Sequence, residues 1–406
     1  MPSSAVIPRD PAVAERLLRT ARSLRDELVA RQAQTEELTH YGPELHEAFQ
    51  RADFYRMLIP VEYGGLEVTP RTFFSVAKEL ARGDVSAAWG FTLTANHALM
   101  LANWFPEPVH RAVFGAGEFR APLMYAPTVT ATAVPEGWRL DGVVNYCSGI
   151  PWSNHFIGAA RLRGTAPNGT PRLGIYVAPA SRFTVIDDWG GMHGLNGTGS
   201  NSIRFDGGVI ERDWLIEDAD ITDFGVAGHS SGSLAYGNAM YSARHMSTFT
   251  LSLAAVCVGG GFNALDAYAE SMRTRTTTLP PFTPRTEDPD FLRWYGEAHI
   301  KLTKAEAALD AVLDRWLEAA ERNVAGAAPF SAAVDLELAG VARELLLDVW
   351  EVVDRHLHRT IGADATKRGN RFERVFRDLG QAAAHRNPQL REPMYRVVAA
   401  QQLGLA

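Results

Sequence analysis

The sequence predicts an α+β fold in the order helices, β-strands, helices. In residues 10–120 and 231–406 apolar side chains recur at helical spacing, whereas in residues 121–230 they alternate with polar ones or form short runs between turn residues. A spacing of three to four residues is typical of amphipathic helices, and alternation is typical of half-buried strands. The predicted division is an N-terminal helical domain (1–120), a middle β-barrel domain (121–230) and a C-terminal helical bundle (231–406).

The N-terminal helices are expected over the first apolar stripe and then over residues 71–82 and 85–103. Pro60 and the glycine pair at 64–65 interrupt the pattern between them, because both residue types disfavour a continuing helix. The last of these helices is small and apolar, so we expect it to lie inside the protein. The stripe that marks the first helix consists of Leu17, Leu18, Ala21, Leu24 and Leu28.

The middle region carries the strand signals. Residues 138–142 and 202–206 alternate apolar with polar, and residues 156–160 and 173–177 are short apolar runs bounded by Gly, Pro and Asn. Several short strands separated by turn residues favour a small barrel or sandwich.

The C-terminal region returns to helical spacing over residues 233–276, 288–324, 331–360 and 371–386. Residues 277–289 contain four prolines and must form a connection. The helical stripes are longer than one small core can cover, which predicts packing in a bundle and then between subunits.

Composition excludes several classes of protein. The 406 residues carry a net charge of −7, which offers no support for binding nucleic acid or an anionic membrane surface. Two cysteines, Cys147 and Cys257, form no disulfide framework and suit a reducing compartment. The N-terminus lacks a secretory pattern, and the most apolar stretch, 249–265, is interrupted by polar residues. We therefore expect a cytoplasmic protein without a membrane span.

Familiar nucleotide and metal motifs are absent from the sequence. No Gly-x-Gly-x-x-Gly follows a predicted strand, which disfavours a Rossmann dinucleotide site. His356 and His358 are two residues apart on a predicted helix and so point to different faces. No metal site is predicted.

Two segments of the β region are candidates for a functional site. Residues 145–155 mix hydroxyls, an indole and an imidazole between two strands, and include Ser148 and Trp152. They form either a polar turn or the wall of a planar-cofactor pocket in which Ser148 reaches ring nitrogens. Residues 191–201 are rich in glycine, and a flexible connection is the favoured interpretation taken alone.

Two further segments lie in the last long helix. Arg371, Arg374, Arg377 and Asp378 share or border one helical face, for which a solvated surface is favoured over anion recognition. His385 closes that helix, where the helix dipole favours the imidazolium form. A surface histidine is the simpler interpretation of His385 alone, and a general base is the alternative.

Taken together, these segments resemble the acyl-CoA dehydrogenase superfamily over nearly the whole chain. Residues 59–65, read as I-P-V-E-Y-G-G, look like the P-x-x-x-G-G turn of that family. Residues 191–206 look like its G-M-x-G-x-x-S-x-x-V-x-F segment. The resemblance implies an acyl-CoA dehydrogenase-like fold with an N-terminal helical domain, a middle β-barrel, a C-terminal four-helix bundle and a homotetrameric assembly.

The C-terminal motif indicates a branch of that family. Dehydrogenases of this fold carry a glutamate base in a Y-E-G-T type segment, and this chain has none. Residues 377–385 instead resemble the R-D-x-x-A-A-x-x-H segment of the flavin-dependent monooxygenases, the oxygenase components of two-component hydroxylases. Ser148-Gly149 resembles the S-S-G turn of that branch, although Cys147 stands in place of its first serine, and His97 matches a histidine near the substrate.

The resemblance implies a reduced-flavin-dependent monooxygenase. Such an enzyme inserts one oxygen of O₂ into an aromatic or polycyclic small molecule through a C4a-hydroperoxyflavin. Its cofactor is reduced FMN or FAD (FMNH2 or FADH2), which a separate NAD(P)H flavin reductase delivers. A dry pocket and a hydrogen bond near flavin N5 are then required of the protein.

The resemblance also implies roles for individual residues. His385 would deprotonate or orient the substrate, His97 would hold its polar group, and Ser148 would contact flavin N5. Further flavin contacts are expected from Gly149, Trp152, Arg275 or its neighbour Arg273, and Arg371. The arginines would contact the flavin phosphate either in this subunit or across a subunit boundary. Three alternatives stay open, namely an N- or S-oxygenase of the same fold, an FAD-containing acyl-CoA dehydrogenase with a relocated base, and a non-catalytic scaffold.

Overall fold

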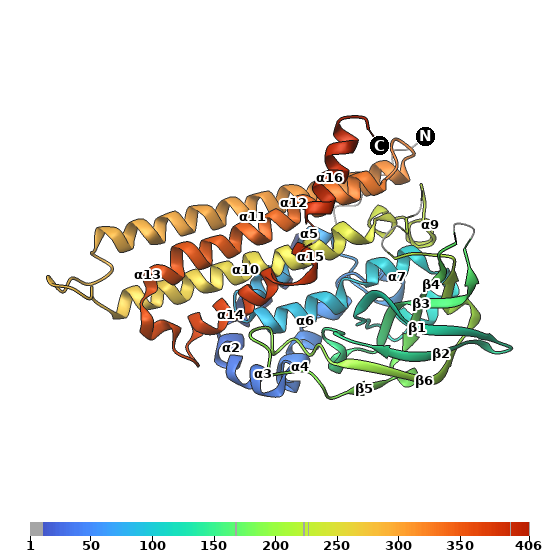
Figure 1. The fold of residues 1–406 in the computed structure, drawn as a ribbon, viewed down its shortest axis with the longest axis horizontal. Helices are drawn as coiled ribbons and strands as arrows, with labels where there is room; N and C mark the ends of the chain where they lie inside the picture. The colour runs from blue at the N-terminus through green and yellow to red at the C-terminus, as the bar shows by residue number, and fades with distance from the viewer. Residues whose placement is uncertain (1–10, 167–168, 222–223, 226, 390, 406) are drawn as a thin grey trace.

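A computed structural model describes residues 11–166, 169–221, 224–225, 227–389 and 391–405. The N-terminal part is helical, as predicted (Figure 1). Helices begin where the sequence supplies caps: Thr69 accepts the Thr72 N–H before α5, and Asp84 accepts the Ala87 N–H before α6. The elements are α1 (Pro11–Ser23), α2 (Arg25–Ala30), α3 (Gln32–Leu38), α4 (Pro43–Arg51), the 3₁₀ turns η1 (Phe54–Arg56) and η2 (Val61–Tyr63), α5 (Pro70–Ala81), α6 (Val85–Ala95), α7 (Ala98–Trp104) and α8 (Glu107–Phe114).

The apolar helix predicted over 85–103 is two helices. α6 ends at Ala95 and α7 begins at Ala98, so that Asn96 and His97 lie in the break between them. Every residue of α6 is buried, as the composition suggested. The break matters because it turns the His97 side chain toward the cavity described below.

The middle region forms one mixed sheet of seven strands in the order β5-β6-β2-β1-β3-β4-β7. β1 runs parallel to β3, and the other pairs are antiparallel. The order ends at β5 and β7 without a pairing between them among the described strands, so the predicted closed barrel is not confirmed. The strands are β1 (Leu123–Val134), β2 (Gly137–Val144), β3 (His155–Thr165), β4 (Pro171–Pro179), β5 (Thr184–Ile186), β6 (Ser202–Ile210) and β7 (Leu215–Glu217), with the 3₁₀ turns η3 (Ile150–Trp152), η4 (Ala180–Arg182) and η5 (Arg212–Trp214).

The C-terminal part is helical again, and its long helices α10, α11 and α12 run alongside one another (Figure 1). α10 is long and apolar enough to cross a membrane by length and composition, but 94% of its most apolar window is buried inside the protein. A buried core helix passes the same test. The elements are α9 (Ser231–Tyr236), η6 (Ala239–Ser242), α10 (His245–Thr274), α11 (Pro289–Val324), α12 (Ala332–Glu351), the π-helical η7 (Val352–His358), α13 (Arg359–Ile361), η8 (Ala363–Thr366), α14 (Arg371–Ala383), α15 (Arg386–Gln389) and α16 (Arg391–Gln402).

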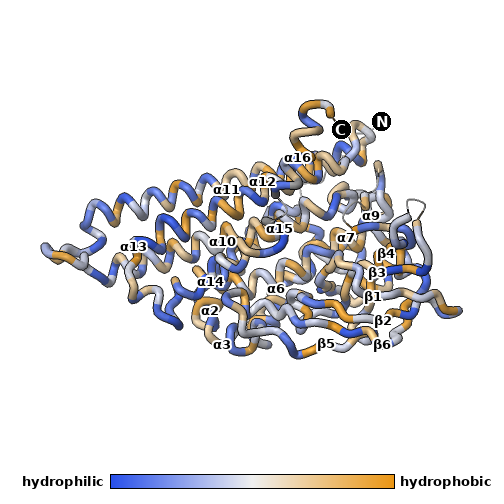
Figure 2. The backbone as a smooth tube through the Cα atoms, in the orientation of Figure 1, coloured by the Kyte–Doolittle hydropathy of each residue, from blue (hydrophilic) through white to orange (hydrophobic). Residues whose placement is uncertain are grey.

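Two hydrophobic cores hold these parts together. The larger core runs from the N-terminal helices through α10, α11 and α12 and includes Ile157, Ile175 and Val177 of the sheet. The smaller core packs inside the sheet around Phe156, Tyr176 and other residues. Along α11, hydrophilic and hydrophobic residues alternate, as expected for a helix with one face toward solvent (Figure 2). The sheet and the C-terminal helices therefore share a core, and the candidate site lies where they meet.

Candidate active site

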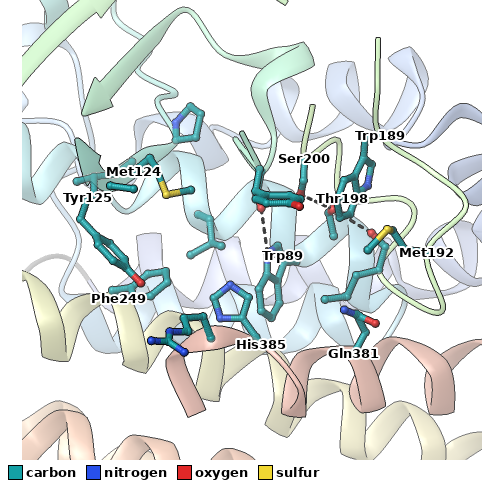
Figure 3. Close-up of a pocket in the computed structure, with 18 of the residues that line it drawn as sticks. Trp89, Met124, Tyr125, Trp189, Met192, Thr198, Ser200, Phe249, Gln381 and His385 are labelled. Carbon is teal, nitrogen blue, oxygen red and sulfur yellow. Dashed lines mark hydrogen bonds between the residues drawn. The ribbon is translucent and has the colours of Figure 1, made fainter. Parts of the chain in front are cut away.

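A cavity of about 570 Å³ lies where α6, the start of β1, the segment between β2 and β3, the segment between β5 and β6, the start of α10 and the end of α14 converge (Figure 3). Its volume is in the range of pockets that hold drug-sized ligands. Apolar and aromatic side chains dominate the wall, and none of the described lining residues is Asp or Glu. The lining consists of Trp89, Leu93, His97, Pro122, Leu123, Met124, Tyr125, Ala126, Tyr146, Ser148, Trp189, Met192, Leu195, Thr198, Ser200, Phe249, Gln381, Ala384, His385 and Arg386.

A chain of hydroxyl groups crosses one wall of the cavity. The Trp89 indole N–H donates to Ser148 Oγ at 3.3 Å, and Ser148 Oγ lies 2.8 Å from Ser200 Oγ. Ser200 Oγ lies 2.7 Å from Thr198 Oγ1, which donates to the Leu195 carbonyl at 2.9 Å. Figure 3 shows these bonds running from Trp89 past Ser200 to Thr198. Ser148 is thus held on two sides.

Gly149 lies behind Ser148 rather than in the cavity wall. Its φ is +78°, and a Cβ atom there would approach the Gly90 carbonyl oxygen and the Thr94 methyl group to 2.5 Å each. Its N–H donates to the Thr198 carbonyl at 2.8 Å. A glycine is needed here because the turn must press directly against α6. This close approach places the Ser148 hydroxyl over Trp89.

His385 lies in the cavity wall just after α14, with its ring 5.5 Å from the Trp89 ring in an edge-on arrangement (Figure 3). Burial lowers the pKa of His385 to about 4. The expectation of an imidazolium stabilised by the helix dipole is therefore wrong, because desolvation outweighs the dipole at this site. His385 is a neutral imidazole at physiological pH.

The surroundings of His385 also determine which ring nitrogen carries the proton. The Asn387 backbone N–H, which can only donate, lies 3.1 Å from His385 Nδ1. Nδ1 must therefore accept, and the proton of the neutral ring lies on Nε2. Asn387 is itself fixed, since it accepts from Arg343 Nε at 3.0 Å and donates to Thr250 Oγ1 at 3.1 Å. Nε2–H is the ring group of His385 that is available to a ligand.

His97 has the opposite arrangement. Its Nδ1 lies 2.8 Å from the Ala121 carbonyl, which can only accept, so Nδ1 carries the proton and Nε2 is bare. His97 Nε2 is buried and has no hydrogen-bond partner among the described residues. Burial lowers the pKa of His97 to about 4, so the ring stays neutral. The cavity therefore has one unpartnered acceptor in its wall.

The charged face predicted on α14 is not a solvated surface. Asp378 is 1% exposed and accepts from the Leu195 N–H at 2.6 Å, from Ser86 Oγ at 2.9 Å and from Arg374 Nε at 3.1 Å. Arg377 is also buried and donates to Glu36 at 2.8 Å. These residues form a buried ionic network that fastens α14 to α3, α6 and the segment before β6. The favoured interpretation was wrong because helix periodicity does not show which polar face meets another element.

Three of the predicted flavin contacts lie away from the cavity in this chain. The Trp152 N–H donates to the Tyr41 carbonyl at 2.8 Å, and its ring stacks on His46 at 4.2 Å. Arg275 pairs with Asp364 at 3.5 Å. Arg275 follows α10, roughly 40 Å along the helix from Phe249 in the cavity wall.

Arg371 donates to Asn263 Oδ1 at 2.8 Å and does not line the cavity either. Neither Arg275 nor Arg371 lines the cavity of this chain, and contact with the flavin of a neighbouring subunit is the alternative that the sequence already allowed. Ser148, His97 and His385 line the same cavity, and the roles of these three residues, like the flavin roles of Trp152 and both arginines, stay predictions.

Sequence reasoning missed Thr198 and Ser200. Both lie in the glycine-rich segment 191–201, which a flexible connection seemed to explain, yet they are 1% and 5% exposed. Two hydroxyl residues spaced by one glycine, ahead of a strand, were the available signal. Cys147, beside Ser148, turns into the core of the sheet, where burial raises the pKa of its thiol. Its side chain has no place in the site.

Comparison with known proteins identifies the family. The model of the acyl-CoA dehydrogenase N-terminal domain matches residues 13–105, and that of the C-terminal domain matches residues 251–389. The chain belongs to the acyl-CoA dehydrogenase superfamily. The family resemblance predicted from the sequence motifs is thereby confirmed.

Similar members of the superfamily include proteins that are monooxygenases by name. The chain is 24% identical to the oxygenase subunit HsaA of a flavin-dependent monooxygenase from Rhodococcus jostii, over 90% of this chain and 93% of that protein. XiaF from Streptomyces, solved with FADH2 and glycerol, superposes with a TM-score of 0.84 at 22% identity over 98% and 97% of the two chains. TdsC from Paenibacillus, solved with FMN and indole, gives 0.79 at 22% identity over 97% and 98%. The superfamily fold is shared over the full length, and the resemblance to the monooxygenase branch is confirmed.

The residues of this superfamily member fit a bound flavin ring. A planar tricyclic ring needs apolar walls and a few polar groups at its edge. Trp89, Trp189 and Met192 supply such walls, and Ser148 offers a hydroxyl beside them. His97 also lines the cavity, and its Nε2, which is buried without a partner among the described residues, would accept from a polar ligand atom that reaches it.

Proposed function

We propose that the protein is the oxygenase component of a two-component, reduced-flavin-dependent monooxygenase that acts on an aromatic or polycyclic small molecule. The observation that carries the proposal is the cavity wall, in which Ser148 and a neutral His385 lie together and the described lining contains no carboxylate. A dehydrogenase of this superfamily needs a carboxylate base over the flavin. The names of HsaA, a flavin-dependent monooxygenase, and of TdsC, a dibenzothiophene monooxygenase, support the same choice.

Reduced FMN or FAD supplies the activation of O₂ when it is bound. The protein's own contribution is to hold the ring and to keep water away from it. Trp89 and Phe249 close the apolar side of the cavity, and Ser148 presents its hydroxyl at the edge. FADH2 is bound to XiaF and FMN to TdsC, so both reduced flavins are candidates here.

His385 and His97 position the substrate. Of the two roles predicted for His385, orienting the substrate fits better than deprotonating it, because a base must present a bare nitrogen and Nε2 carries the proton. His385 then donates to a substrate oxygen. His97 accepts through Nε2 from a substrate O–H or N–H. A phenol satisfies both contacts through its hydroxyl group, an indole satisfies the contact with His97 through its N–H, and an unsubstituted hydrocarbon satisfies neither.

The remaining features of the proposal concern partners and assembly. A separate NAD(P)H flavin reductase supplies reduced flavin, as the naming of HsaA as an oxygenase subunit suggests. We propose that α10, α11, α12 and α14 form the four-helix bundle of a homotetramer. A cytoplasmic location is supported by two free, buried thiols.

The test uses the purified protein with chemically reduced FMN or FAD, added O₂ and a panel of phenols, indoles, amines and sulfides. Expected results are faster flavin reoxidation than in buffer and an oxygenated product from at least one aromatic substrate. His385→Ala should lower product yield about 10- to 100-fold, the size of one or two lost substrate contacts, while peroxide formation continues. His299→Ala on the exposed face of α11 is the matched control.

Two outcomes would contradict the proposal. If the protein reoxidises neither reduced FMN nor reduced FAD faster than buffer does, the proposed oxygenase function is contradicted. Tightly bound yellow FAD that is bleached by an acyl-CoA would support a dehydrogenase instead. Equal loss of product and peroxide in His385→Ala would remove the substrate-orienting role of His385 and leave the reaction class standing.

A further inference from the structure

We propose that Thr198 and Ser200 orient the Ser148 hydroxyl as a hydrogen-bond acceptor toward the cavity, so that the site binds reduced flavin in preference to oxidised flavin. This inference rests on the proposed function and deepens it. It assigns Thr198 and Ser200 as positioning residues, which act on the ligand only through Ser148. Each hydroxyl of the chain has one proton, and the partners of these protons determine the orientation of Ser148.

The assignment of protons begins at the Leu195 carbonyl, at the opposite end of the chain from Trp89. The Leu195 carbonyl oxygen can only accept, so the 2.9 Å contact with Thr198 Oγ1 uses the one proton of that hydroxyl. The 2.7 Å contact between Thr198 Oγ1 and Ser200 Oγ must then be filled by the Ser200 proton. The Leu195 carbonyl, which can only accept, therefore sets the direction of the hydrogen bonds made by the Thr198 and Ser200 hydroxyls.

The same assignment determines the state of Ser148. Because the Ser200 proton is committed, the 2.8 Å contact between Ser200 and Ser148 must use the Ser148 proton. The Trp89 indole N–H can only donate, and it donates to Ser148 Oγ at 3.3 Å. Ser148 Oγ thus gives one bond, receives one and keeps a single free lone pair. Of these groups, Ser148 is the one that is half-buried in the cavity wall.

Burial makes this orientation persistent. Thr198 is 1% exposed, Ser200 is 5% exposed and Trp89 is 2% exposed, so bulk water does not offer them substitute partners. Turning the Ser148 proton into the cavity would leave Ser200 Oγ or Thr198 Oγ1 short of a donor in a buried place. An unmade buried hydrogen bond is unfavourable. The hydroxyls of Ser148, Ser200 and Thr198, called the hydroxyl relay below, therefore have one favoured hydrogen-bond direction, which leaves Ser148 as an acceptor toward the cavity.

The consequence follows from the chemistry of the flavin edge. Position N5 carries a hydrogen in reduced flavin and a bare lone pair in oxidised flavin. A free lone pair on Ser148 Oγ suits the N–H of the reduced form and repels the lone pair of the oxidised form. An oxygenase that receives reduced flavin from another protein and must later release it oxidised benefits from this preference. Selection of the oxidation state is thus a property of Thr198 and Ser200 as well as Ser148.

The test compares variants that free the Ser148 proton with one that does not. Thr198→Val removes the group that accepts from Ser200, and Ser200→Ala removes the group that accepts from Ser148. Thr198→Ser keeps the whole relay and is the conservative control. Dissociation constants for oxidised and for reduced FMN and FAD are measured anaerobically by absorbance and tryptophan fluorescence, and the midpoint potential of the bound flavin is measured independently.

We expect the wild-type protein and Thr198→Ser to bind reduced flavin more tightly than oxidised flavin by the same ratio. Thr198→Val and Ser200→Ala should each lower that ratio about three- to tenfold, the size of one neutral hydrogen bond. A tenfold change corresponds to about 30 mV in a two-electron midpoint potential. Thermal unfolding of each variant checks the fold, and Ser200→Ala serves if Thr198→Val does not fold.

The outcomes separate the two proposals. If Thr198→Val and Ser200→Ala keep the wild-type ratio while Ser148→Ala changes it, the relay is overturned and the oxygenase stands. If the wild-type protein binds oxidised flavin at least as tightly as reduced flavin, the relay is overturned as well. If the wild-type protein binds neither flavin, both the relay and the proposed function fail.

Discussion

Asp378→Asn is the substitution with the most clearly determined cost. Asp378 accepts three hydrogen bonds, and all three partners are donors: the Leu195 N–H at 2.6 Å on one oxygen, and Ser86 Oγ at 2.9 Å and Arg374 Nε at 3.1 Å on the other. Asparagine has the same shape but only one acceptor oxygen. Whichever way the amide lies, its NH₂ group meets either the Leu195 N–H or the Arg374 guanidinium.

The magnitude follows from burial. The side chains of Asp378 and Arg374 are 2% and 6% exposed, so the substitution leaves a buried cation without one of its two nearest anions. Breaking a buried ion pair from one side costs about 3–5 kcal/mol of unfolding free energy. Asp84 and Glu36 also approach Arg374, at 3.8 and 3.1 Å, and they hold the loss toward the lower end. That loss is a large share of the roughly 5–15 kcal/mol available to a typical fold.

Urea unfolding followed by circular dichroism measures this loss. Asp314→Asn is the control, because its carboxylate pairs with Arg71 at 2.6 Å while 59% exposed, and an exposed pair contributes about 0.2–1 kcal/mol. A flavin titration adds a functional readout, since the Leu195 contact holds the segment that carries the hydroxyl relay. A loss for Asp378→Asn no larger than that for Asp314→Asn would refute the reasoning from burial.

Three further predictions follow from the structure. Gly149→Ala should lower the unfolding free energy by about 2–4 kcal/mol through a strained φ and overlap with α6, measured by calorimetry; an unchanged melting temperature would contradict the close approach. Acidification from pH 7.5 to 5.5 should destabilise the fold by about 5 kcal/mol or more, because the four histidines that are at most 9% exposed, each with a pKa of about 4 or below, stay neutral while their unfolded forms protonate below 6.5, and His385 adds to the effect; a denaturation midpoint that is flat across this range would be inconsistent. Asp84, whose pKa burial raises to about 6, opposes this by less than one histidine. Native Cys147 and Cys257 should resist iodoacetamide at neutral pH and react after unfolding, since burial raises the pKa of each thiol; rapid native labelling seen by mass spectrometry would disprove it. The four histidines are His97, His110, His155 and His245.

The sign of the acid effect comes from proton binding. Each of these histidines has a folded-state pKa below its ordinary value of 6.5, so the unfolded chain binds more protons than the folded chain as the pH falls. Their contribution to stability is complete above pH 6.5 and is lost progressively toward pH 4. At pH 5.5 each histidine has lost roughly 1–2 kcal/mol of its contribution to the unfolding free energy.

The sequence by itself determined the order of the fold and the main members of the site. Periodicity reports which face of each segment is apolar, and a helix or strand forms largely from that local pattern. The helical, β and helical parts therefore appear in the predicted order. Ser148, His97 and His385 were recognisable because each stands in a motif of the family, and all three line one cavity.

The tertiary structure alone decided how those residues behave. The proton positions on His385 and His97 depend on the Asn387 N–H and the Ala121 carbonyl. The orientation of Ser148 depends on Thr198 and Ser200, about fifty residues away in the chain. The strand order of the sheet, with β5 and β7 at its two ends, likewise depends on pairings between strands that are distant in the sequence. Hydrogen-bond direction and desolvation are properties of a surrounding, and residues far apart in the sequence create that surrounding only when the chain folds.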